Sequence, residues 1–109
     1  MSNAEDDFLK ELQESFLFEA KDFLAQVESL SLQIEKKQNA DSAFQELERL
    51  AHNLKGSGKA VGFDELARLA HKVEDYVLAL KRGQLEHNSS NLDFLFNCLD
   101  RLKDDVDLL

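Results

Sequence analysis

The sequence predicts an all-α protein that folds as an antiparallel, up-down four-helix bundle. Proline is absent and only 4 glycines occur, so few residues would interrupt a helix. Apolar residues recur at the three- and four-residue steps of an amphipathic helix in the ranges of about 5–36, 41–60, 64–82 and 90–106. The polar stretches between them are short, as in antiparallel bundles. A chain of 109 residues is expected to form a single domain, 1–109.

The first predicted helix, from about Glu5 to Lys36, is long for a globular domain. Its phenylalanine-rich stripe is expected to lie in the core and consists of Phe8, Leu12, Phe16, Phe23, Val27, Leu30 and Ile34. Its length leaves room for a kink or a break near 29–31, but no glycine or proline requires one. Residues Met1–Ala4 have the look of a cloning remnant, and nothing is inferred from them.

The second predicted helix follows a polar link in which Asn39 or Asp41 is expected to provide the N-cap. One stripe of this helix is apolar, with Ala43, Leu47, Leu50, Ala51 and Leu54. The neighbouring stripe carries Glu48, His52, Lys55 and Lys59. His52 should therefore face outward, and Gly62 should end the helix.

The third predicted helix is expected to begin with Asp64 as its N-cap and to end at Gly83. His71 and Glu74 lie on the flank beside its core stripe. Because the connection at 61–64 is short, the second and third helices should be antiparallel neighbours, with the flanks of His52 and Glu74 facing each other. The fourth helix is expected to start with a capping box formed by Ser90 and Asp93.

His52 has neighbours that an ordinary surface histidine lacks. A histidine on the polar face of a helix is most often solvated and without a function. Here Lys55 and Lys59 follow one and two turns later, where they would hold a phosphoryl group near the ring. Gly56 and Gly58 each cost about 1 kcal/mol relative to alanine inside a helix, which points to a packing or access requirement. Small residues there would let the backbone of another protein come close.

The segment 51–63, A-H-N-L-K-G-S-G-K-A-V-G-F, resembles the signature of histidine phosphotransfer (HPt) domains. The chain is most similar to the first domain of CheA-type chemotaxis kinases, which carry a second histidine and a glutamate on the next helix. Those positions fall on His71 and Glu74. The chain departs from the commonest chemotaxis form at Asn53, Lys59 and Ala60. Free-standing HPt proteins and the HPt modules of hybrid kinases, which usually lack the glutamate, remain an alternative.

The resemblance implies that His52 carries a phosphoryl group. We expect Glu74 to accept the N–H of Nδ1, which fixes the tautomer and leaves Nε2 to attack. We expect Lys55 to offset the charge of the phosphoryl group. His71 would complete the hydrogen-bond network around Glu74 and Lys55. The phosphate and partner surface would comprise Lys59, Gly56 and Gly58.

The resemblance also implies two partners. The phosphoryl donor would be ATP held by a separate kinase ATP-binding domain. The acceptor would be an aspartate in the receiver domain of a response regulator, which supplies the magnesium site. No cofactor is expected in this chain, because K-G-S-G-K-A fails the P-loop pattern at Asn53 and at Ala60. The chain is therefore interpreted as a phosphorylated substrate and relay, part of a larger histidine kinase, and not as an enzyme by itself.

Charge and hydropathy exclude other classes of partner. A net charge of −9 argues against nucleic acid and anionic membranes. No apolar run approaches the roughly 20 residues that span a bilayer, so no membrane insertion is expected. The single cysteine, Cys98, suits a reducing compartment, and a cytoplasmic location is expected.

Two rival hypotheses remain at this point. A helical bundle with an acidic surface would also serve as a docking module without chemistry. His52 and His71 would alternatively bind zinc, but no cysteine or carboxylate stands at ligand spacing with them, and Lys55 would repel the ion. No metal site is expected.

Overall fold

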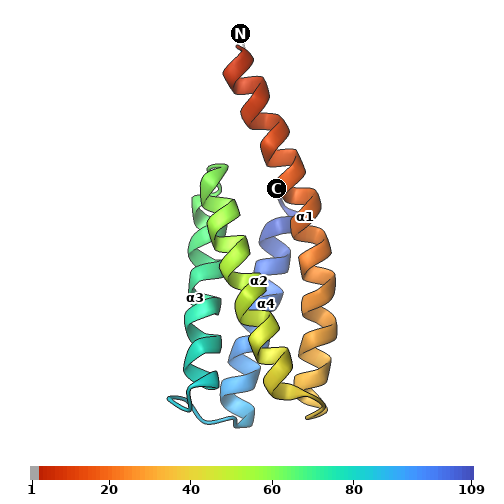
Figure 1. Cartoon of the computed structure of the whole chain (residues 1–109), viewed down its shortest axis with the longest axis vertical. Helices are drawn as coiled ribbons and strands as arrows, with labels where there is room; N and C mark the ends of the chain where they lie inside the picture. The colour runs from red at the N-terminus through yellow and green to blue at the C-terminus, as the bar shows by residue number, and fades with distance from the viewer. Residues whose placement is uncertain (1–2) are drawn as a thin grey trace.

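The computed structural model describes residues 3–109 and shows an antiparallel bundle of four helices (Figure 1). The helices are α1 (Ala4–Glu35), α2 (Ala40–Ala60), α3 (Asp64–Lys81) and α4 (Ser89–Asp107). No strand occurs between residues 3 and 109. The predicted fold class is confirmed, and the predicted helix ranges agree closely with the observed ones. The segment interpreted as a cloning remnant was 1–4, and its residues 1–2 lie outside the described part of the chain.

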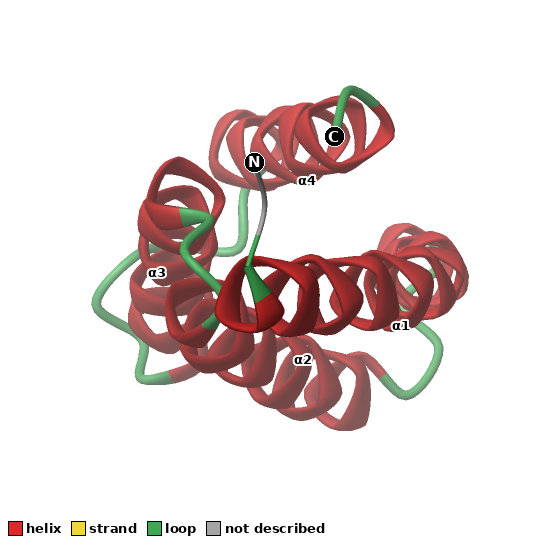
Figure 2. Cartoon of the chain, turned by 90° about the horizontal axis from the view of Figure 1, so that it is seen from above, coloured by secondary structure: helices red, strands yellow, loops and turns green. Residues whose placement is uncertain are grey.

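The helices surround a common core when the bundle is seen from above (Figure 2). The most extensive contact is between α2 and α3, and the least extensive is between α1 and α4. Over residues 3–109, none of the helices combines the length and apolarity that crossing a membrane requires. The closely packed α2–α3 pair is the one that carries the predicted site residues.

Apolar side chains fill the bundle in two adjoining clusters. The cluster nearer the α1–α2 connection includes Phe44, Leu47 and Val77. The cluster nearer the α2–α3 turn includes Phe16 and Leu54. Burying a large apolar side chain contributes about 1.5–3 kcal/mol, so both clusters hold α2 and α3 firmly against the rest of the bundle.

The predicted apolar stripe of α1 is only partly buried. From Phe16 to Ile34 it packs in the core, but the first turns of α1 project beyond the other helices (Figure 1). Phe8 is 62% exposed and Leu12 is also exposed, so the prediction that they lie in the core is wrong. The reason is length, because α1 has 32 residues whereas α2 has 21. The helix runs without a break through 29–31.

Three helix starts differ from the prediction. Asn39 precedes α2 as expected, but its backbone is left-handed (φ 52°) and its side chain makes no capping hydrogen bond. Phe63 occupies the N-cap position of α3, and Asp64 lies instead in the first turn, where its charge favours the helix dipole. Asn88, not Ser90, caps α4, because its extended backbone lets its Oδ1 accept a backbone N–H at 2.9 Å.

Gly62 ends α2 as predicted. Its φ is +89°, a conformation that favours glycine. The Phe63 N–H donates to Gly58 O at 2.9 Å and the Gly62 N–H to Lys59 O at 3.1 Å, the bond pair typical of a left-handed helix end. Gly83 (φ +74°) ends α3 in a similar way. The tight turn after α2 makes α2 and α3 antiparallel neighbours and sets the flank of His52 opposite that of Glu74.

Candidate functional site

His52 lies on the outer face of α2. Its side chain is 64% exposed, whereas Ala51 and Leu54 on the inner face are buried. The prediction that His52 faces outward is confirmed. A ring in this position is open to another protein on one side and contacts α3 on the other.

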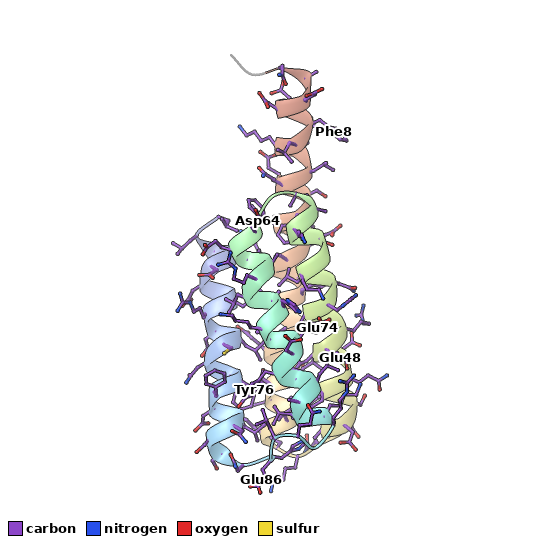
Figure 3. All side chains as sticks on the ribbon, turned by 90° about the vertical axis from the view of Figure 1, so that its left-hand side faces the viewer. Phe8, Glu48, Asp64, Glu74, Tyr76 and Glu86 are labelled. Atoms are coloured by element: carbon purple, nitrogen blue, oxygen red, sulfur yellow. The ribbon has the colours of Figure 1, made fainter. Side chains whose placement is uncertain are left out.

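Within residues 3–109, Glu74 is the one charged residue that is buried. It lies on α3 at the seam with α2 (Figure 3). Burying an unpaired carboxylate is unfavourable, so its partners matter. Its Oε2 lies 2.5 Å from Nδ1 of His52, and its Oε1 accepts a hydrogen bond from Lys55 Nζ at 2.8 Å. Both oxygens of Glu74 are thus engaged by residues of α2.

The ionisation state of Glu74 determines the tautomer of His52. Burial alone would raise the pKa of Glu74, but the hydrogen bonds from Lys55 and His52 outweigh burial and lower this pKa. An ionised carboxylate only accepts hydrogen bonds. In the neutral ring, Nδ1 must therefore hold the proton, and Nε2 is left with the lone pair.

Lys55 connects the carboxylate to the space beside His52. Its side chain is 27% exposed, and besides contacting Glu74 it lines a groove between α2 and α3. An ammonium group in this place neutralises Glu74 and also raises the potential felt by an anion that approaches the ring. Lys55 is therefore suited to both structural pairing and phosphoryl binding.

His71 has a different partner from the expected one. Its Nε2 lies 3.6 Å from Oδ2 of Asp75, one turn later on α3. Between residues 3 and 109, no hydrogen bond joins it to Glu74 or Lys55, and the oxygens of Glu74 accept from α2 side chains instead. His71 lines the groove beside the site instead of completing the network.

The two glycines of α2 have different reasons for being small. A Cβ at Gly58 would lie 3.4 Å from Cζ of Phe16, so this glycine lets α1 pack close to α2. A Cβ at Gly56 would meet no atom within 4 Å. Because 3.4 Å is an ordinary contact distance, Gly58 leaves room for a methyl group but not for a large side chain, and the absence of a side chain at Gly56 keeps the surface beside His52 open.

Two grooves lie on either side of the His52–Glu74 pair. The first, called here the basic groove, has a volume of about 540 Å³ and is lined by Lys55, Gly56, Lys59, Asp64, Ala67, Arg68 and His71. The second, called the mixed-charge groove, has a volume of about 470 Å³ and is lined by Ser42, Gln45, Glu46, Glu48, Arg49, His52, Glu74 and Lys81. Figure 3 shows Asp64 on the side of Glu74 nearer the α2–α3 turn and Glu48 on the other side.

Arg68 was missed by the sequence analysis. It lies three residues before His71 on α3 and lines the same groove, so helical spacing alone would have placed it there. The ion pair between Lys81 and Glu48 (2.7 Å) was also missed, since it joins α3 to α2 across 33 residues of sequence. Pairs of this kind depend on the register of two helices, which the sequence pattern does not provide.

Among residues 3–109, one set of side chains has ligand atoms close enough for a metal ion, namely His71, Glu74 and Asp75. The oxygens of Glu74 already accept hydrogen bonds from His52 and Lys55. The ammonium group of Lys55 would also repel a cation. The expectation that no carboxylate stands at ligand spacing with His71 is wrong, because Glu74 and Asp75 both do. The contacts of Glu74 with His52 and Lys55 nevertheless favour hydrogen bonding over metal binding.

Residues 11–106 match the family model of the Hpt domain. The chain is also similar to the chemotaxis protein CheA of several organisms. Identity is 32% over 98 residues in Halobacterium salinarum, 33% over 103 residues in Treponema pallidum and 32% over 88 residues in Bacillus subtilis. These matches cover 90%, 94% and 81% of this chain. They cover only 14%, 13% and 13% of the relatives, so the chain spans a small part of their length.

A solved structure supports the fold. The crystal structure of a computationally redesigned four-helix bundle superimposes with a TM-score of 0.79 and covers 93% of this chain and 95% of its own. Its sequence is 20% identical to this chain. At this identity the likeness concerns the fold alone.

Proposed function

Since this chain belongs to the Hpt domain family, we propose that it relays a phosphoryl group through His52 in two-component, chemotaxis-type signalling. The observation that carries this proposal is the buried carboxylate of Glu74, whose Oε2 lies 2.5 Å from Nδ1 of the exposed His52. A surface histidine without a function has no need of such a partner. This carboxylate also favours a relay over a docking module without chemistry.

His52 acts as the nucleophile in this proposal. The lone pair of Nε2 forms a bond to the γ-phosphorus of ATP as the bond to the leaving ADP oxygen breaks. The proton on Nδ1 stays on the ring, and Glu74 stabilises the positive charge that develops there. Lys55 offsets the charge of the phosphoryl group beside the ring.

The second transfer reverses the roles of the atoms. A carboxylate oxygen of the acceptor aspartate attacks phosphorus, the P–N bond breaks, and its electron pair returns to Nε2. The donor is the ATP-binding domain of a histidine kinase, and the acceptor is the receiver domain of a response regulator. The similarity to CheA proteins over most of this chain favours a chemotaxis kinase as the source of the domain. Because ATP is the donor, the relay would operate in the cytoplasm.

The experiment tests His52 in two steps. In the first step, one sample of the chain is treated with phosphoramidate, which loads histidine without a kinase. A separate sample is treated with a CheA ATP-binding domain and ATP. We expect one phosphoryl group per chain by mass spectrometry, stable to base and labile to acid. The loaded chain is then mixed with chemotaxis receiver domains and magnesium, and transfer to an aspartate is expected.

Two histidine variants serve as controls. His52→Gln should accept no phosphoryl group from either donor. His87→Gln changes a histidine in the α3–α4 connection, away from the site, and should be loaded like the wild type. A chain that accepts no phosphoryl group, or that accepts it at His87, would leave the docking module as the better hypothesis.

A further inference from the structure

The basic groove is a local exception in an acidic chain. The sequence has 22 acidic and 13 basic residues, yet Lys59 and Arg68 pair with no carboxylate within residues 3–109. Three cationic side chains and one carboxylate line this groove. The unpaired charges of Lys59 and Arg68 are therefore available to an anionic partner.

The mixed-charge groove on the other side of His52 has the opposite character. Its two cations are already paired, Arg49 with Glu46 and Lys81 with Glu48. Three carboxylates line this groove, so an anionic partner would meet no free positive charge there. The electrostatic surroundings of His52 are thus asymmetric along the α2–α3 seam.

Phosphoryl transfer from His52 to an aspartate brings anions together. A magnesium site is built from carboxylates, so the surface around the acceptor aspartate is acidic. The chain itself has a net charge of −9 and repels such a surface at long range. A basic groove beside the phosphorylated ring would reverse this repulsion locally and orient the approach.

We propose that the basic groove faces the acidic surface of the acceptor domain beside its magnesium site, so that the acceptor domain approaches His52 from the side of the α2–α3 turn. This inference rests on the proposed function and adds Arg68 as a residue that determines partner orientation. Gly56 supports it, because this residue of the groove lies one turn after His52 and has no side chain, and a Cβ there would have no neighbour within 4 Å. The groove volume of about 540 Å³ leaves room for carboxylate side chains.

The test measures transfer from preloaded protein. Wild type and Arg68→Glu are loaded to completion with phosphoramidate, and transfer to the receiver domain that accepts from wild type is followed with magnesium present. At low ionic strength the second-order rate of Arg68→Glu should fall about tenfold, which is the scale of electrostatic steering. At about 0.5 M salt the difference should shrink to roughly twofold or less, because the charges are screened.

Matched variants separate the groove from net charge and from folding. Arg101→Glu makes the same change at an exposed position of α4 and should transfer at the wild-type rate. Arg68→Lys keeps the charge and should retain most of the rate, whereas Lys59→Glu should resemble Arg68→Glu. Melting temperatures should agree among all variants.

The outcomes are distinguishable from those for the proposed function. If no receiver domain accepts the phosphoryl group from loaded wild type, the relay itself is contradicted. If wild type transfers and Arg68→Glu transfers equally well at low salt, the groove is not the acceptor surface. If Arg68→Glu slows only phosphorylation by the ATP-binding domain, the groove belongs to the donor and the proposal is overturned.

Discussion

The two faces of α2 differ in what their residues do. The inner face places Ala51, Leu54 and Gly58 against the core, where they are buried. The outer face places His52 and Lys55 at the α3 seam, where both contact Glu74. One helix thus combines packing on one side with access and charge on the other. The difference implies that stability and phosphotransfer can be altered separately by substitutions only a few residues apart.

The largest effect is expected from removing the nucleophile on the outer face. His52→Gln should abolish phosphorylation by kinase and ATP, because no other side chain would hold a reactive nitrogen in this place. The melting temperature should change little, since the His52 side chain is 64% exposed. Radiolabel incorporation and thermal denaturation measure the two quantities. Phosphorylation of the variant at the wild-type rate would contradict the assignment of His52.

The second effect concerns Glu74, the buried residue of α3 that contacts His52 and Lys55 on the outer face of α2. Without its carboxylate, the ring orientation and tautomer of His52 are no longer fixed. Glu74→Ala should therefore slow phosphorylation about tenfold to a hundredfold, as other losses of an orienting hydrogen bond do. The loss should appear in the rate at saturation more than in affinity for the kinase domain. Single-turnover kinetics would separate the two.

Nitrogen NMR of the imidazole provides a control that does not depend on a kinase. Wild type should show the form with the proton on Nδ1, and Glu74→Ala should weaken this preference. Asp75→Ala is the matched variant, because Asp75 is an exposed acid that contacts His71 instead of His52. Normal phosphorylation of Glu74→Ala, together with a wild-type ring protonated on Nε2, would show that Glu74 has no role in the chemistry.

The two glycines allow the same substitution to be tested on opposite faces. Gly58→Leu would force a side chain against Phe16 and should destabilise the fold by about 1–3 kcal/mol. Gly56→Leu meets open space and should stabilise the helix by about 0.5–1 kcal/mol, because leucine has the higher helix propensity. Urea denaturation measures both. If both variants lose the same stability, the faces do not differ as described.

The rate of phosphotransfer should rank Gly56→Leu and Gly58→Leu in the opposite order to their stability. Gly56→Leu fills the space beside His52 and should slow transfer to the acceptor although the protein is more stable. Gly58→Leu leaves the outer face unchanged and should still transfer at a temperature where it is folded. Faster transfer by Gly56→Leu would contradict the access requirement.

The sequence predicted the helices and the faces of α2 because both follow from local periodicity. It also predicted that His52 and Glu74 face each other, because Gly62 allows a turn short enough to make α2 and α3 neighbours. It did not predict the exposure of Phe8, since that depends on the relative lengths of helices and not on the stripe itself. The contact of His71 with Asp75 was also missed, although the two residues lie one turn apart on α3, a spacing that the sequence itself shows.

The last effect is a dependence of stability on pH that comes from Glu74, the α3 partner of the outer face. The pKa of Glu74 is lowered in the folded chain, despite burial, by the hydrogen bonds from Lys55 and His52. Below the ordinary carboxyl pKa of 4.5, the unfolded chain therefore binds more protons than the folded one, and the free energy of unfolding rises with pH in this range. The stabilisation from Glu74 is complete above pH 4.5 and is lost as the pH falls through the lowered, folded-state pKa.

This contribution can be measured as a difference between two chains. Glu74→Gln should be less stable than wild type by about 1 kcal/mol at pH 7, because its hydrogen bonds are no longer charge-assisted. The deficit should shrink at an acidic pH below the lowered, folded-state pKa of Glu74, where the wild-type carboxylate is protonated. Gly58→Leu is the matched contrast, because its deficit comes from packing on the inner face and should be the same at both pH values. A Glu74→Gln deficit that also stays constant would mean that the lowered pKa of Glu74 does not contribute to stability.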